Sequence, residues 1–210
     1  MRIGYFGGTF DPPHRAHLLA AQAAADALRL DRVLLAPTGV QPLKQDGPHA
    51  SYEDRLAMTR LLCAEDSRLE VSEIDAPHLD GSPNYTVEAL ARLRAEFSTA
   101  EIFVIVGADS FLSLPRWRDP EKLLAEAEWI VLSRPGFDLN SIDPDHGGEG
   151  IASLNLTAEQ RARVHLVETL DEDISASGIR ERLRVGVSCG KSLTPTVGLY
   201  IARMHLYHAT

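Results

Sequence analysis

The sequence predicts an α/β fold, a doubly wound parallel sheet with helices on both faces. Short apolar runs rich in β-branched residues alternate with helical stretches, and glycine or proline ends several of these runs. Strands separated by helices imply right-handed crossovers and therefore parallel strands. Runs that are apolar almost throughout are typical of strands covered on both faces. With 210 residues and a 44% hydrophobic composition, the chain suits one such domain.

The expected elements follow one another with short connections. The clearest strand is the run from Ile102 to Val106, which Gly107 stops. Strands are expected over residues 3–6, 32–36, 69–74, 102–106, 129–132 and 164–167. Helices are expected over 13–29, over 51–63, from 84 or 86 to 97, and over 175–184. The last of them belongs to a small C-terminal helical portion.

Two further stretches complete the chain. Residues 137–156 are predicted to be a surface loop or insertion. The sequence Thr157-Ala158-Glu159-Gln160 has the layout of a capping box, so a short helix should begin there. No internal repeat or domain boundary is evident, and residues 1–210 are therefore expected to form a single domain.

Charge and composition exclude several classes of protein. The net charge is −9, from 30 acidic and 21 basic residues, so a long nucleic-acid partner is not expected. The chain contains no apolar stretch of membrane-spanning length and no signal-peptide layout, which indicates a cytoplasmic protein without a membrane partner. Cys63 and Cys189 lie far apart without a C-x-x-C pattern, so we expect two ordinary thiols.

The segment that joins the first strand to the first helix is the most informative. It reads Gly7-Gly8-Thr9-Phe10-Asp11-Pro12-Pro13-His14-Arg15-Ala16-His17. Ligands of open parallel sheets bind beyond the carboxyl ends of the strands, where this loop lies. Pro13 suits the first helical position, which places both histidines on one face of the first turn. Glycine backbone, free helix amides and two imidazole donors together favour a bound phosphate.

Other interpretations of this segment stay open at this point. The glycines could form an ordinary turn, and the histidines could lie on the surface. His14 and His17 could also bind a metal together with Asp11. The sequence has no further Cys/His cluster to supply the usual additional ligands, so no metal site is predicted.

A second motif begins the expected helix near the C-terminal end and reads Ile174-Ser175-Ala176-Ser177-Gly178-Ile179-Arg180. Ser175 is a plausible N-cap, and Ser177 adds a hydroxyl close to the free amides. Arg180 lies about one turn further on, where a guanidinium can hold a phosphate with two hydrogen bonds. An isolated Ser-x-Ser would indicate only a capped surface helix. Two helix starts suited to anions in one α/β chain instead favour a phosphate ligand.

Together the two motifs resemble the signature of nucleotidylyltransferases with an H-x-G-H motif. Over nearly its whole length the chain is similar to the bacterial nicotinate-nucleotide adenylyltransferases. Segments that support the narrower match are Pro42-Leu43-Lys44, Pro83-Asn84-Tyr85-Thr86, Gly107-Ala108-Asp109, Leu114-Pro115-Arg116-Trp117 and Ser133-Arg134-Pro135-Gly136. The resemblance implies a Rossmann-like nucleotidyltransferase domain that transfers AMP from ATP to nicotinate mononucleotide in NAD biosynthesis.

The resemblance also implies a role for each matching residue. The ATP site would comprise Gly7, Gly8, Thr9, Phe10, His14, His17, Gly107, Asp109, Ile174, Ser175, Ser177 and Arg180. The acceptor site would comprise Lys44, Tyr85, Thr86, Asp109, Trp117 and Arg134. The catalytic set would be His14, His17, Lys44 and Arg180.

Some of these roles are specific. Trp117 would stack on the nicotinate ring, and Thr86 with neighbouring amides would bind its carboxylate. Asp109 would accept hydrogen bonds from a ribose, and Arg134 would contact the phosphate of the acceptor. Each has a structural alternative, such as a core tryptophan or a solvated charge.

The implied chemistry needs no covalent protein intermediate. A phosphate oxygen of the acceptor would attack the α-phosphorus of ATP in line, and pyrophosphate would leave, so positioning and charge neutralisation would provide the catalysis. The expected cofactor is Mg²⁺, carried by the ATP phosphates and water. Small substrates are the expected partners, and a homo-oligomer is compatible with the sequence.

At three positions the chain departs from the family pattern. Ala16 stands where the motif has glycine, and its methyl group would press on an adenine lying against the helix start. Ser177 replaces the usual threonine and keeps the hydroxyl. Arg118 follows Trp117 where some relatives carry a second aromatic residue, and its guanidinium could stack or favour a carboxylate.

Two rival functions remain at this stage. A sister transferase acting on nicotinamide mononucleotide, phosphopantetheine or riboflavin phosphate would share both phosphate motifs, but Tyr85-Thr86 and Trp117 favour an aromatic acid. A non-catalytic nucleotide-binding regulator would not need the whole set of phosphate-binding side chains. A metal-dependent hydrolase is a more distant third.

Overall fold

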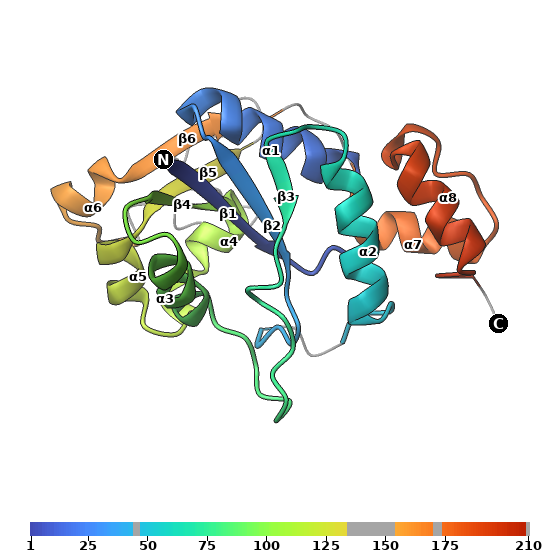
Figure 1. Ribbon diagram of the computed structural model, residues 1–210, viewed down its shortest axis with the longest axis horizontal. Coiled ribbons are helices and arrows are strands. Elements are labelled where there is room, and N and C mark those ends of the chain that lie inside the picture. Colours follow the sequence, from blue (N-terminus) through green and yellow to red (C-terminus); the bar gives the residue numbers. More distant parts are fainter. Residues whose placement is uncertain (44–46, 134–153, 170–173, 209–210) are drawn as a thin grey trace.

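The structure is a computed structural model that describes residues 1–43, 47–133, 154–169 and 174–208. Its centre is a six-stranded, all-parallel sheet with the strand order β3-β2-β1-β4-β5-β6 (Figure 1). This is the order of a doubly wound Rossmann sheet, so the predicted fold class is confirmed. The strands are β1 (Arg2–Gly8), β2 (Arg32–Pro37), β3 (Leu69–Val71), β4 (Glu101–Gly107), β5 (Glu128–Ser133) and β6 (Val164–Glu168).

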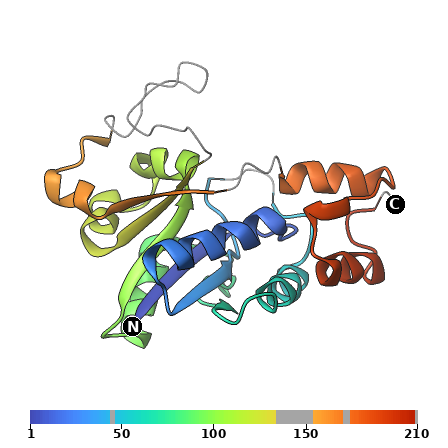
Figure 2. The same ribbon diagram turned by 90° about the horizontal axis from the view of Figure 1, so that it is seen from above.

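Helices cover both faces of this sheet. One face carries α1 (Arg15–Leu28), α2 (Tyr52–Cys63) and α8 (Pro195–Arg203). The other face carries α3 (Thr86–Glu96), α4 (Ala108–Leu112) and α5 (Pro120–Glu126), with the short 3₁₀ helix η1 (Leu114–Arg116). Figure 2 shows α6 (Ala158–Ala162) at one end of the molecule and α7 (Ala176–Arg184) with α8 at the other.

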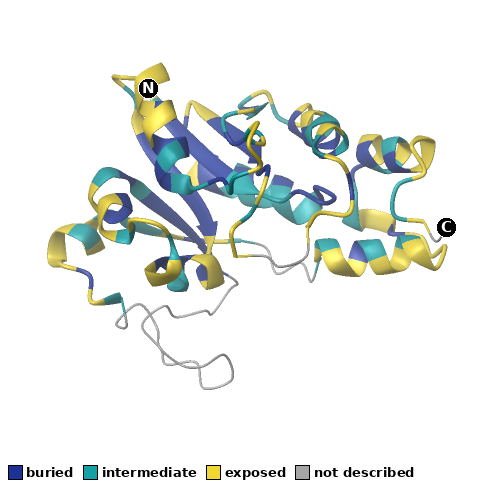
Figure 3. Cartoon of the chain, turned by 90° about the horizontal axis from the view of Figure 1, so that it is seen from below, coloured by how far each residue is buried: buried dark blue, intermediate teal, exposed yellow. Residues whose placement is uncertain are grey.

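The strands alternate their side chains between two hydrophobic cores. Leu34 packs in the core with α3, α4 and α5, while Leu35 packs in the core with α1, α2 and α8. Val104 and Ile105 of β4 divide in the same way, as expected from the two-residue repeat of a strand. Figure 3 shows the strands buried and the outer helix surfaces exposed. The apolar strands of the sequence are therefore explained by two covered faces.

Most expected elements are present with shifted ends. Helix α1 begins at Arg15, with the extended residue His14 as its N-cap, so the prediction that Pro13 starts the helix was wrong. Strand β3 ends at Val71 instead of residue 74, because the amide of Ala76 turns back onto the carbonyl of Glu73 at 2.9 Å. The predicted capping box is confirmed, since the Thr157 amide donates to Gln160 Oε1 at 2.9 Å.

Three α-helices within the described residues were not anticipated. Helices α4 and α5 are too short to show a hydrophobic repeat. Helix α8 contains Thr196, Val197 and Gly198, which are poor helix formers, and it is stabilised by packing on α2. Of the expected loop over 137–156, residues 137–153 lie outside the described residues, whereas Leu156 is buried in a core.

Two sequence expectations concern the molecule as a whole. Cys63 and Cys189 are both free and buried. None of the helices in the described ranges is both long and apolar enough to cross a membrane.

Candidate active site

The candidate site lies where the winding of the sheet changes direction. Strands β1 and β4 are neighbours, yet the chain continues from β1 into α1 on one face and from β4 into α4 on the other. The two connections diverge beyond Gly8 and Gly107 and leave a crevice, which is the usual ligand site of doubly wound sheets. The first sequence motif and the Gly107-Ala108-Asp109 segment therefore meet at this edge.

The turn after β1 is tight and constrained. A Cβ atom on Gly7 would lie 2.6 Å from the Tyr5 hydroxyl oxygen, so a larger residue cannot be accommodated without a shift. Phe10 adopts a left-handed conformation with φ of 50° and is buried. The Gly8 carbonyl accepts a hydrogen bond from the Thr38 amide at 2.8 Å. These contacts fix the backbone at the predicted nucleotide loop.

His14 and His17 stack on one another at the start of α1. Their ring centroids lie 3.7 Å apart, and the planes differ by 29°. The His14 amide donates to His17 Nδ1 at 3.2 Å, so a neutral His17 ring carries its proton on Nε2. The Phe10 ring, 4.9 Å from that of His17, supports the pair from the side. The predicted pairing of the histidines is thus present, although His14 precedes the first turn.

Burial gives the two imidazoles different environments. Only 6% of His14 is exposed, and its Nδ1 atom is buried without a hydrogen-bond partner in the described part of the chain. Burial lowers the pKa of His14 to about 4. His14 is therefore neutral at physiological pH, and it offers a hydrogen bond instead of a positive charge.

The second motif forms the predicted helix start. Ser175 is the N-cap of α7, and its Oγ atom accepts the Gly178 amide at 3.1 Å. Its hydroxyl lies 3.3 Å from that of Ser177, while Ile174 immediately precedes the cap. The prediction of an N-capped helix here is confirmed.

Arg180 joins the two motifs. Its Nη1 atom donates to the Asp11 backbone carbonyl at 2.6 Å, a contact between residues 169 positions apart in the sequence. The start of α7 is thereby held beside the loop that leads into α1, so the hydroxyls of one motif and the imidazoles of the other share one locality. The sequence suggested two separate phosphate-binding helix starts, and the structure brings them together.

Two buried residues support this loop. Arg55 was not singled out from the sequence, and Asp11 was considered there as a metal ligand. Arg55 of α2 is 1% exposed, and its Nη1 atom donates to the carbonyls of Thr9 and Thr38 at 2.7 and 2.9 Å. In the sequence it resembles a surface cation of a helix. Asp11, considered as a metal ligand, instead accepts the amides of His49 and Ala50 at 2.7 and 3.1 Å.

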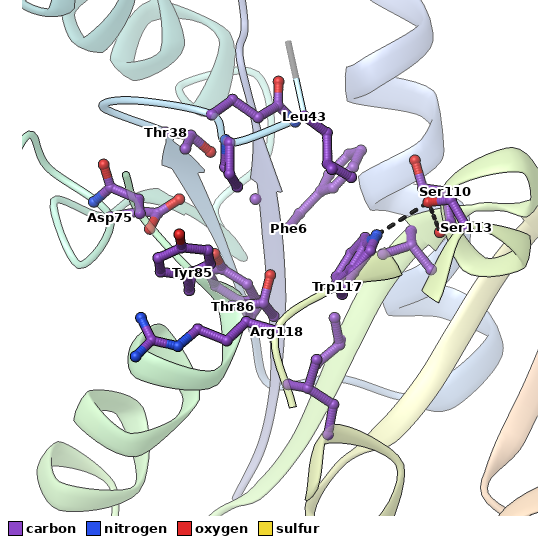
Figure 4. A pocket seen from close by; sticks show the side chains of 18 of the residues that line it. Phe6, Thr38, Leu43, Asp75, Tyr85, Thr86, Ser110, Ser113, Trp117 and Arg118 are labelled. Atoms are coloured by element: carbon purple, nitrogen blue, oxygen red, sulfur yellow. Dashed lines mark hydrogen bonds between the residues drawn. The ribbon is translucent and has the colours of Figure 1, made fainter. Parts of the chain in front are cut away.

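A cavity of about 370 Å³ opens beside the phosphate motifs, between the carboxyl ends of β1, β2 and β4. Figure 4 shows Tyr85 and Thr86 on one side of it and Trp117 on the other. Gly7 and Gly107 line the cavity as well, so it adjoins the nucleotide loop directly. Three of the predicted acceptor residues therefore line one cavity.

The two aromatic walls of the cavity are held in different ways. The Trp117 Nε1 atom donates to Ser113 Oγ at 3.0 Å, and its ring packs edge-on against Trp129 with a centroid distance of 6.3 Å. The Arg118 guanidinium lies 4.6 Å from the centroid of the Tyr85 ring. The Trp117 ring is thus fixed in place but only partly buried, which suits a residue that stacks on a planar ligand.

The polar end of the cavity includes groups that the sequence did not reveal. Asp75 is buried in the wall, and hydrogen bonds from Tyr5 and Thr38 support its carboxylate. Burial raises the pKa of Asp75 despite these donors. Asn84 is also buried, where it accepts the Val40 amide and donates to the Ala76 carbonyl, both at 2.8 Å. Packing between distant loops brings Asp75 to this wall, and no local pattern singled it out, whereas Asn84 belongs to the Pro83-Asn84-Tyr85-Thr86 segment, which carried no role for it.

The remaining predicted residues are distributed as follows. Asp109 is exposed in the first turn of α4, next to Gly107 but outside the cavity wall. Lys44 and Arg134 lie outside the described residues. Within those residues, no group of three or more His, Cys, Asp or Glu side chains could hold a metal ion.

Comparisons with known proteins agree with this arrangement. Residues 5–182 match the family described as cytidylyltransferase-like. A probable nicotinate-nucleotide adenylyltransferase of Chromobacterium violaceum is 41% identical over 98% of both chains. A protein of the same description from Roseiflexus is 40% identical, over 98% of this chain and 97% of its own.

A solved structure has a similar fold. The Plasmodium falciparum nicotinic acid mononucleotide adenylyltransferase complexed with NaAD superposes with a TM-score of 0.72 over 98% of this chain and 97% of that one, at 16% identity. That identity supports the fold alone, whereas the bacterial relatives are similar enough in sequence to assign the family. The chain belongs to the cytidylyltransferase-like family and, within it, to the nicotinate-nucleotide adenylyltransferases.

Proposed function

We propose that this protein transfers AMP from ATP to nicotinate mononucleotide, giving nicotinate adenine dinucleotide and pyrophosphate. The observation that carries the proposal is the contact of Arg180 with the Asp11 carbonyl at 2.6 Å, which joins both phosphate motifs beside an aromatic cavity. A phosphate site next to a pocket for a planar ring fits a reaction that links two nucleotides. The full-length bacterial relatives carry the matching name.

The phosphate end would hold the ATP triphosphate. His14 and His17 donate hydrogen bonds from the start of α1, and Ser175, Ser177 and Arg180 approach from the start of α7. Each of these groups donates hydrogen bonds, and the helix start adds a positive field, so the charge that develops on the phosphate oxygens is stabilised. Neutral His14 provides orientation, while Arg180 provides charge.

The cavity would hold the acceptor. Trp117 stacks on the nicotinate ring, and its hydrogen bond to Ser113 keeps the indole plane in place. Tyr85 is the N-cap of α3, so the amides of Thr86 and Val87 lie in the first helical turn, where they would bind the nicotinate carboxylate. Lys44, Asp109 and Arg134 keep the roles that the family resemblance implies, as part of this proposal.

The reaction is a displacement at phosphorus. An oxygen of the acceptor phosphate forms a bond to the α-phosphorus, the bond from that phosphorus to the bridging oxygen breaks, and pyrophosphate leaves with the electron pair. The attacking oxygen is already ionised at neutral pH, so the protein's task is alignment and charge stabilisation.

The side chains at the phosphate end fit anions rather than a metal ion. His, Ser and Arg donors would bind phosphate oxygens, and we propose that Mg²⁺ is held by those phosphates and by water. The ion would neutralise phosphate charge during transfer. A cytoplasmic location and a homo-oligomeric state remain predictions of the sequence.

The test is to incubate the purified protein with ATP, Mg²⁺ and one acceptor at a time, following pyrophosphate and the dinucleotide product. The acceptors are nicotinate mononucleotide, its amide, phosphopantetheine and riboflavin phosphate. Turnover mainly with nicotinate mononucleotide supports the proposal. Preference for another acceptor would retain the chemistry but reject the assigned acceptor, and ATP binding without any turnover would instead support a regulator.

A further inference from the structure

The chain segment after α8 returns to the first loop of the molecule. Helix α8 packs on α2, and Leu206 and Tyr207 then pack against the core beneath α1 and α2. Tyr207 lies beyond the end of α8 and has a left-handed backbone with φ of 65°. Its hydroxyl donates to Asp11 Oδ1 at 2.7 Å, across 196 positions of sequence.

Asp11 is a buried carboxylate surrounded by donors from three parts of the chain. It is 3% exposed. Its carboxylate accepts the amides of His49 and Ala50 and the hydroxyl of Tyr207, and Arg180 Nη1 lies 3.9 Å from Oδ2. Without the Tyr207 hydroxyl, Oδ1 of this carboxylate keeps the Ala50 amide but loses one donor, and losing a hydrogen bond to a buried charged group is costly.

The position of Asp11 connects this cluster to the imidazoles. Asp11 lies three residues before His14, the N-cap of α1. The backbone carbonyl of Asp11 accepts a hydrogen bond from Arg180 Nη1. A displacement of Asp11 therefore moves the chain that enters α1 and the arginine that joins the two motifs. Hydrogen-bond donors for a phosphate must be placed within a fraction of an ångström to be effective.

We propose that Tyr207 is a positioning residue of the phosphate site, acting through Asp11 on His14, His17 and Arg180. It touches neither substrate in the proposed function, on which this inference rests. Its contribution is to hold the carboxylate that fixes the loop.

The phenol is suited to this task. Burial, together with the neighbouring Asp11 carboxylate, raises the pKa of Tyr207 well above its ordinary value. The hydroxyl therefore stays protonated at physiological pH and remains a donor to the carboxylate.

The experiment compares two tyrosine variants with matched chemistry. Y207F removes the hydroxyl that binds Asp11 and keeps the ring. Y200F removes the hydroxyl that donates to Asp54 Oδ1 at 2.9 Å, another bond between the C-terminal portion and the body of the protein. Both variants lose one Tyr–Asp hydrogen bond, but only Y207F affects Asp11. The measurements are kcat, the KM values for ATP and for the acceptor, the Kd for ATP and the thermal unfolding temperature.

In Y207F, kcat/KM for ATP should fall on the order of tenfold, because a hydrogen bond to a buried charged group is lost. The acceptor KM should stay within about twofold of the wild type, as should every kinetic constant of Y200F. Equal kinetic effects in the two variants would overturn the proposal by showing a general loss of stability, and an unchanged Y207F would overturn it as well.

The ATP Kd separates this inference from the proposed function. If the wild-type protein turns over no acceptor, the proposed function fails, but the Kd for ATP still tests Tyr207. A weaker Kd in Y207F and an unchanged Kd in Y200F would then support the positioning role. Equal Kd values in all three proteins would reject it.

Discussion

The phosphate end of the site and the acceptor cavity lie at the same edge of one sheet, yet they are constructed differently. The phosphate end consists of two short sequence motifs whose backbone is held by buried groups, among them Arg55, Asp11 and Arg180. The cavity is lined by single side chains from several loops, and some of them, such as Leu43 and Arg118, are exposed. The first half is pre-organised before a ligand arrives, whereas part of the second half is open to solvent.

Because of this difference, alignment for the chemical step and selection of the acceptor should depend on different regions of the enzyme. A rigid phosphate end provides the alignment that a displacement at phosphorus needs, and that chemistry is common to many acceptors. In the proposed function, the cavity would select the acceptor through a few side chains that can be exchanged without disturbing the loop. Substitutions at the first end should therefore change kcat and the constants for ATP, and substitutions at the second should change the acceptor KM and the acceptor selectivity.

The largest expected effect follows from His17→Ala. Loss of one donor to the developing phosphate charge should lower kcat on the order of 100- to 1000-fold. The acceptor KM should change little, because His17 does not line the cavity. Steady-state kinetics with both substrates measure the split. Turnover close to normal would refute the role of His17, and the unfolding temperature serves as the control because His17 also accepts the His14 amide.

The burial of His14 predicts a pH dependence of stability. Folded His14 has a pKa of about 4, below the ordinary 6.5, so protonation favours the unfolded state. The stabilisation is complete above about pH 6.5 and is lost as the pH falls towards 4, amounting to about 2 kcal/mol between pH 7.5 and 5. Urea unfolding of the wild type and of His14→Asn at both pH values measures the free energy of unfolding. Between pH 7.5 and 5 this free energy should fall less in the variant than in the wild type. Equal losses of unfolding free energy in the two proteins would contradict the assignment of this pH dependence to His14.

The cavity is tested by Trp117→Ala. Loss of the stacking surface should raise the acceptor KM about 10- to 100-fold, by analogy with the contribution of aromatic stacking to base binding. The ATP KM should remain near the wild-type value, and Trp117→Phe should recover part of the affinity. An increase confined to the ATP KM would show that the Trp117 ring contacts ATP. It would contradict the inference that the two regions bind different substrates.

The smallest effect is expected for Arg118→Gln. The guanidinium lies over Tyr85 at the cavity and forms an exposed ion pair with Glu88 at 3.2 Å. Without it, the preference for the acid over the amide acceptor should fall about two- to fivefold, because exposed charges act weakly. Arg116→Gln is the matched control, since Arg116 also lines the cavity. Equal effects of the two substitutions would indicate a general charge effect instead of a role for Arg118.

The contrast also explains what could be predicted from the sequence. The strands, the cap at Ser175 and the pairing of His14 with His17 depend on residues within a few positions, so local patterns revealed them. Arg55 and Asp75 depend on packing between distant loops, and in the sequence they resemble surface charges. Helix α8 escaped prediction because its stability comes from α2 rather than from its own residues.

The contact between Asp11 and Tyr207 has a consequence for the order in which the protein folds. The loop that carries the histidines contains Asp11, and the hydroxyl that donates to the Asp11 carboxylate belongs to a residue 196 positions further along the chain. Contacts of such long sequence separation form late, after the intervening chain has been ordered. The sheet can therefore form while the Asp11 carboxylate still lacks its hydrogen bond from Tyr207, and the loop is completed only when the segment after α8 has docked.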